Sequence, residues 1–187
     1  MADRPPPRQG NLFEGSAEAS GQAPGADLPL LEHQLLDWQQ RLRAFQAPRF
    51  EAAARGAALS AGQIDLFGAP QLRAATVQRL DPQALAARHL HFWRWPESDA
   101  PGAALYFVLD RPPHLDGALL LYVGETAQSD RRWKGDHDCK RYLAAYGDAL
   151  QDCGLGSGLS IRFWRDAPGE VRARRALEQA LIRHWLP

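Results

Sequence analysis

The chain has 187 residues, 45% of them apolar, with two cysteines and a formal net charge of zero. This length predicts one domain of ordinary size with additional segments, and the apolar content is sufficient for a hydrophobic core. Two cysteines exclude a disulfide framework, and without a signal peptide or a long apolar run we expect a cytoplasmic protein with no membrane segment. Zero net charge gives no general attraction to nucleic acid, so such binding would depend on locally placed basic residues.

Residues 1–27 are rich in proline, glycine, alanine and serine, a composition typical of a disordered tail. Residues 28–100 follow as a helical arm and linker. Within this arm, apolar residues at alternating spacings of three and four predict an amphipathic helix over residues 28–46, ended by Pro48. We expect this stripe to pack on the rest of the chain; a helix pair or a dimer contact is the alternative, and the oligomeric state is not predicted. The stripe consists of Leu28, Leu31, Leu35, Trp38, Leu42 and Phe45.

The rest of the arm has weaker patterns. Residues 49–62 are rich in alanine and indicate a short helix, whereas residues 71–80 fit either a helix or a strand. Asp81 and Pro82 are typical of a helix cap and a first helical turn. We therefore predict a helix from this point to about His89.

Residues 101–187, the C-terminal unit, begin with two short apolar runs at 104–109 and 119–123, separated by a loop rich in turn residues. The runs predict a β-hairpin, and residues 159–164 predict a third strand. The order of elements predicts an α+β fold: a small, mixed or antiparallel three-stranded sheet flanked by helices, with an N-terminal helical extension. The helices expected in this unit include residues 140–150 and 170–186.

Basic residues gather after the second of these strands. Ser129 or Asp130 is a suitable helix cap, and Arg131, Arg132 and Lys134 then fall in the first turns of the helix. Cations at a helix N-terminus oppose the helix dipole. Because basic residues are unfavourable there unless they bind a negative group, this pattern predicts an anion-binding site at this position.

Four features occur in one order in the C-terminal unit. Tyr106 ends the sequence Ala-Leu-Tyr, and Tyr122 begins the sequence Tyr-Val-Gly. Arg132 lies eight residues after that glycine, and Glu178 lies in the last predicted helix. This ordered set resembles the GIY-YIG nuclease domain, over about residues 101–187. The sequence departs from the family pattern at Ala104, where the first motif has glycine, and in the hairpin loop, which is longer than a minimal one.

The resemblance implies a metal-dependent endonuclease that hydrolyses DNA phosphodiester bonds. It implies that Glu178 holds Mg²⁺ or Mn²⁺, hard cations that prefer oxygen ligands, and that Arg132 stabilises charge on the phosphate. Tyr106 or Tyr122 would orient or deprotonate the attacking water, and the choice between them stays open. His137, one position beyond a histidine that some family members carry, is a further catalytic candidate. The candidates for DNA binding are Arg131, Lys134, Lys140 and Arg141.

The same residues have structural interpretations. The two tyrosines also suit half-buried strand positions, and Glu178 has the helical spacing for an ion pair with Arg174 or Arg175. Cys139 and Cys153 lack the further ligands and the spacing of a zinc site. We therefore expect both cysteines to be free and buried.

Gln63 begins a second short motif, Gln-Ile-Asp-Leu-Phe, within the arm. It resembles the bacterial sliding-clamp-binding motif. Leu66 and Phe67 would fill an apolar pocket, while Gln63 would hydrogen-bond at its rim and Ile64 would add contact area. Residues 9–13 form a weaker copy, Gln-Gly-Asn-Leu-Phe, which lacks the aliphatic second residue. The alternative is a linker that docks onto the protein's own core.

The sequence therefore predicts a bacterial, cytoplasmic endonuclease of GIY-YIG type, recruited to DNA by the sliding clamp for repair or recombination. Two alternatives use the same fold: a non-catalytic adaptor that binds DNA or the clamp, and a restriction endonuclease. Family members commonly carry a supporting asparagine after the glutamate helix, whereas this sequence ends at Pro187, which favours the adaptor. The ordered motif residues favour the nuclease. The preferred DNA structure or sequence is not predicted.

Overall fold

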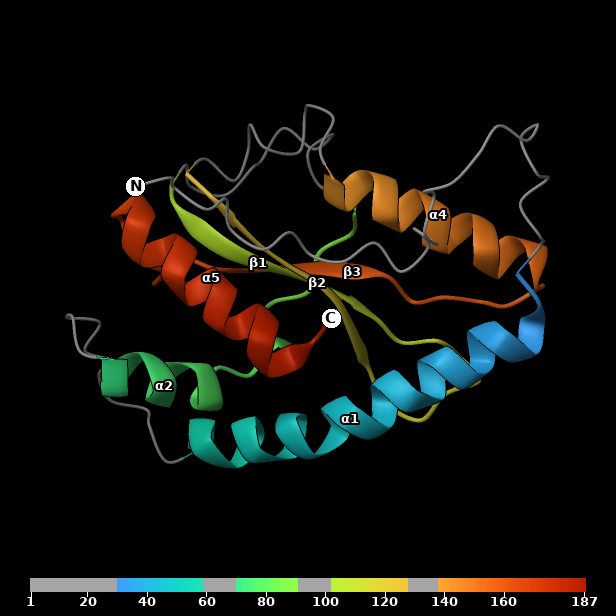
Figure 1. Ribbon diagram of the computed structural model, residues 1–187, viewed down its shortest axis with the longest axis horizontal. Helices are drawn as coiled ribbons and strands as arrows, with labels where there is room; N and C mark the ends of the chain where they lie inside the picture. The colour runs from blue at the N-terminus through green and yellow to red at the C-terminus, as the bar shows by residue number, and fades with distance from the viewer. Residues whose placement is uncertain (1–29, 59–69, 91–101, 128–137) are drawn as a thin grey trace, which may run out of the picture.

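The computed structural model describes residues 30–58, 70–90, 102–127 and 138–187 (Figure 1). At its centre is a three-stranded antiparallel sheet in the order β2-β1-β3. The predicted α+β fold with a three-stranded sheet is confirmed, and the sheet is antiparallel rather than mixed. The strands are β1 (Ala104–Asp110), β2 (Leu119–Thr126) and β3 (Ser160–Trp164).

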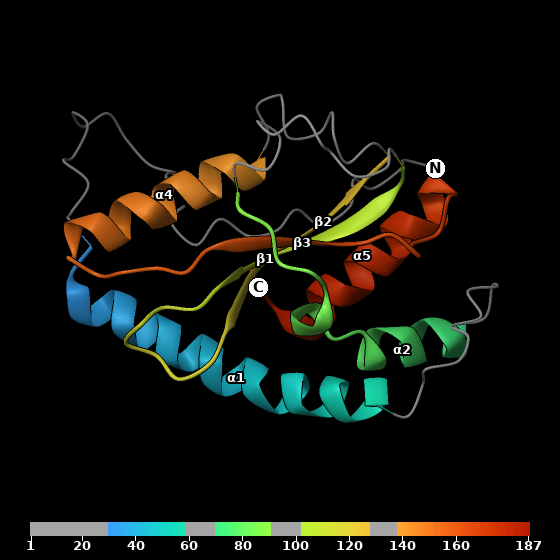
Figure 2. The same ribbon diagram turned by 180° about the vertical axis from the view of Figure 1, so that it is seen from behind.

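Helices cover both faces of the sheet (Figure 1, Figure 2). One face packs against α5 (Val171–Trp185), α2 (Pro70–Arg79) and the C-terminal half of α1 (Glu32–Ala58). The other face packs against α4 (Asp138–Asp152). Every residue of β1 is buried between these layers. This explains why the strand is a continuous apolar run without the alternation of a half-exposed strand.

The prediction that Pro48 ends the first helix is wrong, because α1 continues through it to Ala58. Proline has no N–H, so it removes one helical hydrogen bond and favours a bend at this point. Arg49, the next residue, holds this part of the helix: its Nη1 donates to the Phe45 carbonyl at 2.6 Å. Its Nε donates to the His184 carbonyl of α5 at 2.9 Å, so contact with α5 supports the helix beyond the proline.

The two weaker patterns in the arm both form helix. Residues 49–58 continue α1 without a break, and residues 70–79 form α2, so the second pattern is a helix rather than a strand. Phe50 of α1 and Val77 of α2 enter the same hydrophobic cluster as α5 and the sheet. None of the described helices is long and apolar enough to cross a membrane.

The helix predicted to follow Asp81 is wrong beyond its first turn. Asp81 does cap this turn, because its Oδ1 accepts the N–H of Gln83 at 2.8 Å, but the turn is a single 3-10 turn, η1 (Pro82–Ala84). The chain then extends, and Arg88 exchanges two backbone hydrogen bonds of 2.9 Å with Ile161 of β3. Pairing with a strand edge has outweighed the local helical signal.

The N-terminal segment thereby covers both edges of the sheet. At the β2 edge, the buried Gln46 of α1 accepts the N–H of Leu120 at 2.8 Å. Its Nε2 donates to the carbonyls of Leu120 at 2.9 Å and Trp185 at 3.1 Å. At the β3 edge, Arg88 makes the equivalent backbone contacts. An open strand edge is a template for unwanted pairing, so these contacts protect the sheet.

The N-terminal half of α1 packs against α4, as the apolar stripe predicted. Leu35 and Trp38 lie in one hydrophobic cluster with Tyr146 and Leu150 of α4. The Trp38 and Tyr146 rings meet edge to face, with their centroids 5.9 Å apart. These two residues of the stripe therefore pack on the protein's own core, whereas Leu31 is exposed and Leu28 lies outside the described residues.

Beneath this cluster, a buried carboxylate joins three elements. Asp110, at the end of β1, accepts the Tyr146 hydroxyl at 2.7 Å and the Gly158 N–H at 2.6 Å. Gln39 of α1 donates to the same hydroxyl at 2.8 Å. Burial raises the pKa of Asp110 above its usual range, and burial together with the neighbouring Asp110 charge raises the pKa of Tyr146. The hydrogen bonds tie α1, α4 and β1 into one unit.

We predict that Gln46→Ala lowers the free energy of unfolding by about 2–4 kcal/mol, because buried backbone groups of Leu120 lose their partner. Gln40→Ala is the matched control, since Gln40 is exposed on the same helix. Its effect should stay within about 0.5 kcal/mol. Urea unfolding of both variants measures the difference, and equal losses would contradict the role given to Gln46.

Candidate functional site

Two tyrosines stack on the face of the sheet that α4 covers. Tyr106 of β1 and Tyr122 of β2 have ring centroids 5.9 Å apart and an interplanar angle of 12°. A β-bulge between Val108 and Leu109 shifts the register of the hairpin, and Tyr122 pairs with Val108. Tyr106 is fully buried, whereas Tyr122 is partly exposed. The two residues that the sequence singled out together therefore do meet, and they differ in their access to solvent.

Gly124 is required by the position of the Tyr106 ring. The two residues are direct cross-strand partners. A Cβ added to Gly124 would lie 2.3 Å from Cζ and 2.4 Å from the hydroxyl oxygen of Tyr106. The glycine of the Tyr-Val-Gly sequence thus gives the tyrosine of the other strand room to lie across the β2 backbone.

The first turn of α4 lies beside the tyrosines. Tyr142 contacts Tyr122, with ring centroids 6.2 Å apart, and Cys139 is buried in the same cluster as Tyr106. Lys140 and Arg141 belong to this turn, and Arg141 forms an exposed ion pair with Asp138. Two of the predicted DNA-binding residues therefore belong to the end of α4 that packs on the tyrosine face of the sheet.

Glu178 reaches the same stretch of β2 from α5. Its Oε1 accepts the backbone N–H of Glu125 at 2.9 Å. Because β2 is an edge strand, an N–H that donates to a side chain in this way faces away from the β1 ladder. The Glu178 carboxylate therefore lies at the outer edge of β2, one residue along from the glycine that Tyr106 covers.

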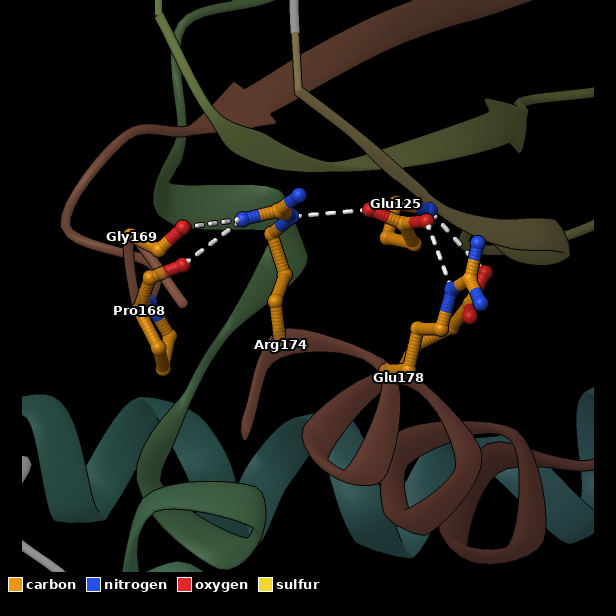
Figure 3. A network of polar contacts seen from close by, with 6 residues as sticks. Glu125, Pro168, Gly169, Arg174 and Glu178 are labelled. Carbon is orange, nitrogen blue, oxygen red and sulfur yellow. Dashed lines mark hydrogen bonds and ion pairs between the residues drawn. The ribbon is translucent and has the colours of Figure 1, made fainter. Parts of the chain in front are cut away.

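Glu125 anchors this end of β2 to α5 (Figure 3). Its carboxylate accepts Arg174 Nε at 2.8 Å and Arg175 Nε at 3.3 Å. Arg174 is buried, and its Nη1 also donates to the carbonyls of Pro168 and Gly169, at 3.0 and 2.9 Å. Helical spacing predicts these arginines as partners of Glu178, but both form ion pairs with Glu125, which the sequence pattern does not identify. The only sequence signal was a carboxylate directly after the Tyr-Val-Gly glycine.

The Glu178 carboxylate fits a cation site of one limited kind. It is partly exposed and supplies hard oxygen atoms, which suit Mg²⁺ or Mn²⁺. Within the described residues there is no group of three or more acidic, histidine or cysteine side chains suited to hold a metal ion. This donor set agrees with a cation that keeps most of its waters and takes further oxygen ligands from a substrate, and it does not agree with a closed protein cage.

The remaining predicted residues of the site lie outside the described part of the chain, between Ala127 and Asp138. Their roles stay predictions. They are Arg131, Arg132, Lys134 and His137. Cys139 and Cys153 are both free, and Cys139 is buried as expected, whereas Cys153 is only partly buried.

No family model, no curated protein and no solved structure matches this chain at a significant level.

We predict that Gly124→Ala lowers the free energy of unfolding by about 1–3 kcal/mol, because the added methyl group would overlap the buried Tyr106 ring. Gly147→Ala is the control: a Cβ there meets no atom within 4 Å, and alanine suits the interior of α4, so this variant should gain about 0.5–1 kcal/mol. Chemical unfolding measures both, with near-ultraviolet circular dichroism for the tyrosines. A Gly124→Ala protein as stable as the wild type would contradict the close approach.

Proposed function

We propose that this protein is an endonuclease of GIY-YIG type that hydrolyses phosphodiester bonds of DNA with Mg²⁺ or Mn²⁺. The observation that supports the proposal concerns two consecutive residues of β2: Tyr106, stacked on Tyr122 at the α4 face of the sheet, lies across Gly124, and Glu178 of α5 accepts the N–H of Glu125. These three side chains come from three separate elements. Residues that the sequence singled out far apart in the chain are thus attached to adjacent positions of one strand, the tyrosines at the α4 face and Glu178 at the outer edge.

Their access to solvent suggests different roles for the two tyrosines. Tyr122 is partly exposed, so its hydroxyl is the better candidate to orient the water that attacks phosphorus. Tyr106 is fully buried and stacks on Tyr122, so we assign it a positioning role. As the water oxygen bonds to phosphorus, the bond to the leaving oxygen breaks, the water proton passes to a base, and the leaving oxygen takes up a proton.

Glu178 would hold the divalent cation. When bound, such a cation stabilises the negative charge that develops on the phosphate oxygens. The Glu125 N–H fixes the direction of the Glu178 carboxylate by its hydrogen bond to Oε1. The residue is partly exposed, which leaves it accessible to solvent.

Basic residues near the site compensate for the neutral charge of the whole chain. Lys140 and Arg141 lie in the first turn of α4, beside the ring contact between Tyr142 and Tyr122. Arg132 would contact the phosphate, and Arg131 and Lys134 would contact the DNA backbone. Local charge of this kind allows DNA binding without a basic overall composition.

We predict that the wild type cuts DNA in Mg²⁺ or Mn²⁺ but not in EDTA, and that Glu178→Gln lowers the rate by about 100-fold or more. Several kcal/mol of metal stabilisation in the transition state correspond to such a factor. The amide keeps an oxygen that can accept the Glu125 N–H, so the fold should be retained. A panel of labelled duplex, nicked, flap and branched DNAs measures the cutting.

Glu170→Gln, at the N-cap of α5, is the control for the loss of one carboxylate. Glu170 is exposed, and its side chain makes no capping hydrogen bond, so this variant should cut like the wild type. Equal rates for Glu178→Gln and the wild type would contradict the proposed metal site. A wild type that binds DNA but cuts none of the panel in either metal would favour the adaptor.

We propose the bacterial sliding clamp as a partner, on the basis of Gln63, Ile64, Leu66 and Phe67. This motif lies outside the described residues, on the connection between Ala58 of α1 and Pro70 of α2. Attachment to the clamp would raise the local concentration of a weakly binding nuclease at DNA.

We predict that Leu66→Ala/Phe67→Ala weakens clamp binding by at least about tenfold, since buried apolar anchors contribute most of the affinity of such peptides. Leu12→Ala/Phe13→Ala in the weaker copy at residues 9–13 is the matched control and should change the affinity little. Titration calorimetry with a purified bacterial clamp measures both variants. The same affinity for the wild type and the first variant would exclude this mode of recruitment.

A further inference from the structure

Arg175 is an exposed arginine held beside Glu178. Its side chain is 66% exposed, and its Nε lies 3.3 Å from Glu125 Oε1. Arg175 and Glu178 are three residues apart on α5, so their side chains leave neighbouring positions on the helix. Both contact Glu125, the first at its carboxylate and the second at its backbone N–H.

The charge of Arg175 is not cancelled by Glu125, because this carboxylate is shared. Arg174 is only 1% exposed, and its Nε lies 2.8 Å from Glu125 Oε2. A buried cation without a counter-charge is strongly unfavourable, so Glu125 primarily balances Arg174. The two arginines with Glu125 and Glu178 sum to a formal charge of zero (Figure 3). When Glu178 holds the proposed cation, the exposed guanidinium of Arg175 is the charge that neither glutamate balances.

The contact at Nε also orients this guanidinium. The terminal nitrogens of Arg175 make no hydrogen bond with the part of the chain that the structure describes. A guanidinium held at Nε presents its terminal nitrogens in a fixed plane, which suits the oxygens of a phosphate. An exposed ion pair contributes little to stability, so the contact of Arg175 adds little to the anchor that the buried Arg174 provides.

We propose that Arg175 binds a DNA phosphate next to the scissile one, with Glu125 as the residue that orients it. This inference rests on the proposed nuclease function and adds a substrate-binding residue that the motif resemblance does not include. Arg175 would hold the strand beside Glu178 by direct contact with the backbone. The expected specificity is for a phosphodiester strand rather than for particular bases, because phosphate contacts carry no sequence information directly.

The test is the salt dependence of DNA binding in EDTA, which separates binding from cutting. The wild type, Arg175→Gln and Arg172→Gln are titrated with a labelled duplex at several salt concentrations. Arg172 is an exposed arginine in the first turn of α5 and controls for the loss of one charge on this helix. We expect Arg175→Gln to make the slope of log K against log salt less steep by about 0.9. The factor by which affinity falls between about 0.1 M and 1 M salt would then be about eightfold smaller for the variant than for the wild type.

Arg172→Gln should leave the slope unchanged. Arg175→Lys should keep the slope, because the charge is retained, but bind more weakly than the wild type, because the planar fork is lost. Arg175→Gln with the slope and affinity of the wild type overturns the inference while cutting by the wild type still supports the nuclease. A wild type that neither binds nor cuts DNA overturns the proposed function and the inference with it.

Discussion

The strand at the centre of the sheet is buried along its whole length, and this constraint shapes the rest of the protein. A three-stranded sheet has two faces and two edges that must be covered. The C-terminal unit provides α4 for one face and α5 for the other. The N-terminal segment provides what is missing, with Gln46 against the edge of β2 and Arg88 against the edge of β3. The helical arm is therefore part of the same packed core as the sheet.

The same packing builds the candidate site. Tyr106 lies across Gly124 because the two residues face each other in the hairpin, and the next residue, Glu125, is fastened to α5 by Arg174. Arg174 in turn holds the turn before α5 through two backbone carbonyls. Because these contacts hold α5 against β2, Glu178 of α5 reaches the edge of β2. The tyrosines and Glu178 are thus each positioned by contacts between the sheet and its helices.

Much of the fold was predictable because its signals are local. The three strands are short apolar runs between turn residues, and the last helix has a clear apolar face, so each prediction overlaps the observed element. The errors have a common cause. Pro48 was expected to stop the first helix, but Arg49 ties the following turn to α5. The helix expected after Asp81 is replaced by pairing with Ile161. In both places a contact with a distant element outweighs the local preference.

By itself, the sequence determined the order of strands and helices and the choice of two tyrosines and one helical glutamate as candidates, because periodicity and short motifs are properties of neighbouring residues. Only the tertiary structure decided that Tyr106 is buried while Tyr122 is accessible, and that Glu125 joins β2 to Arg174. It also decided that α1 covers the edge of β2. These features join residues that lie far apart in the chain. They depend on which surfaces meet when the sheet is covered, and no local pattern contains that information.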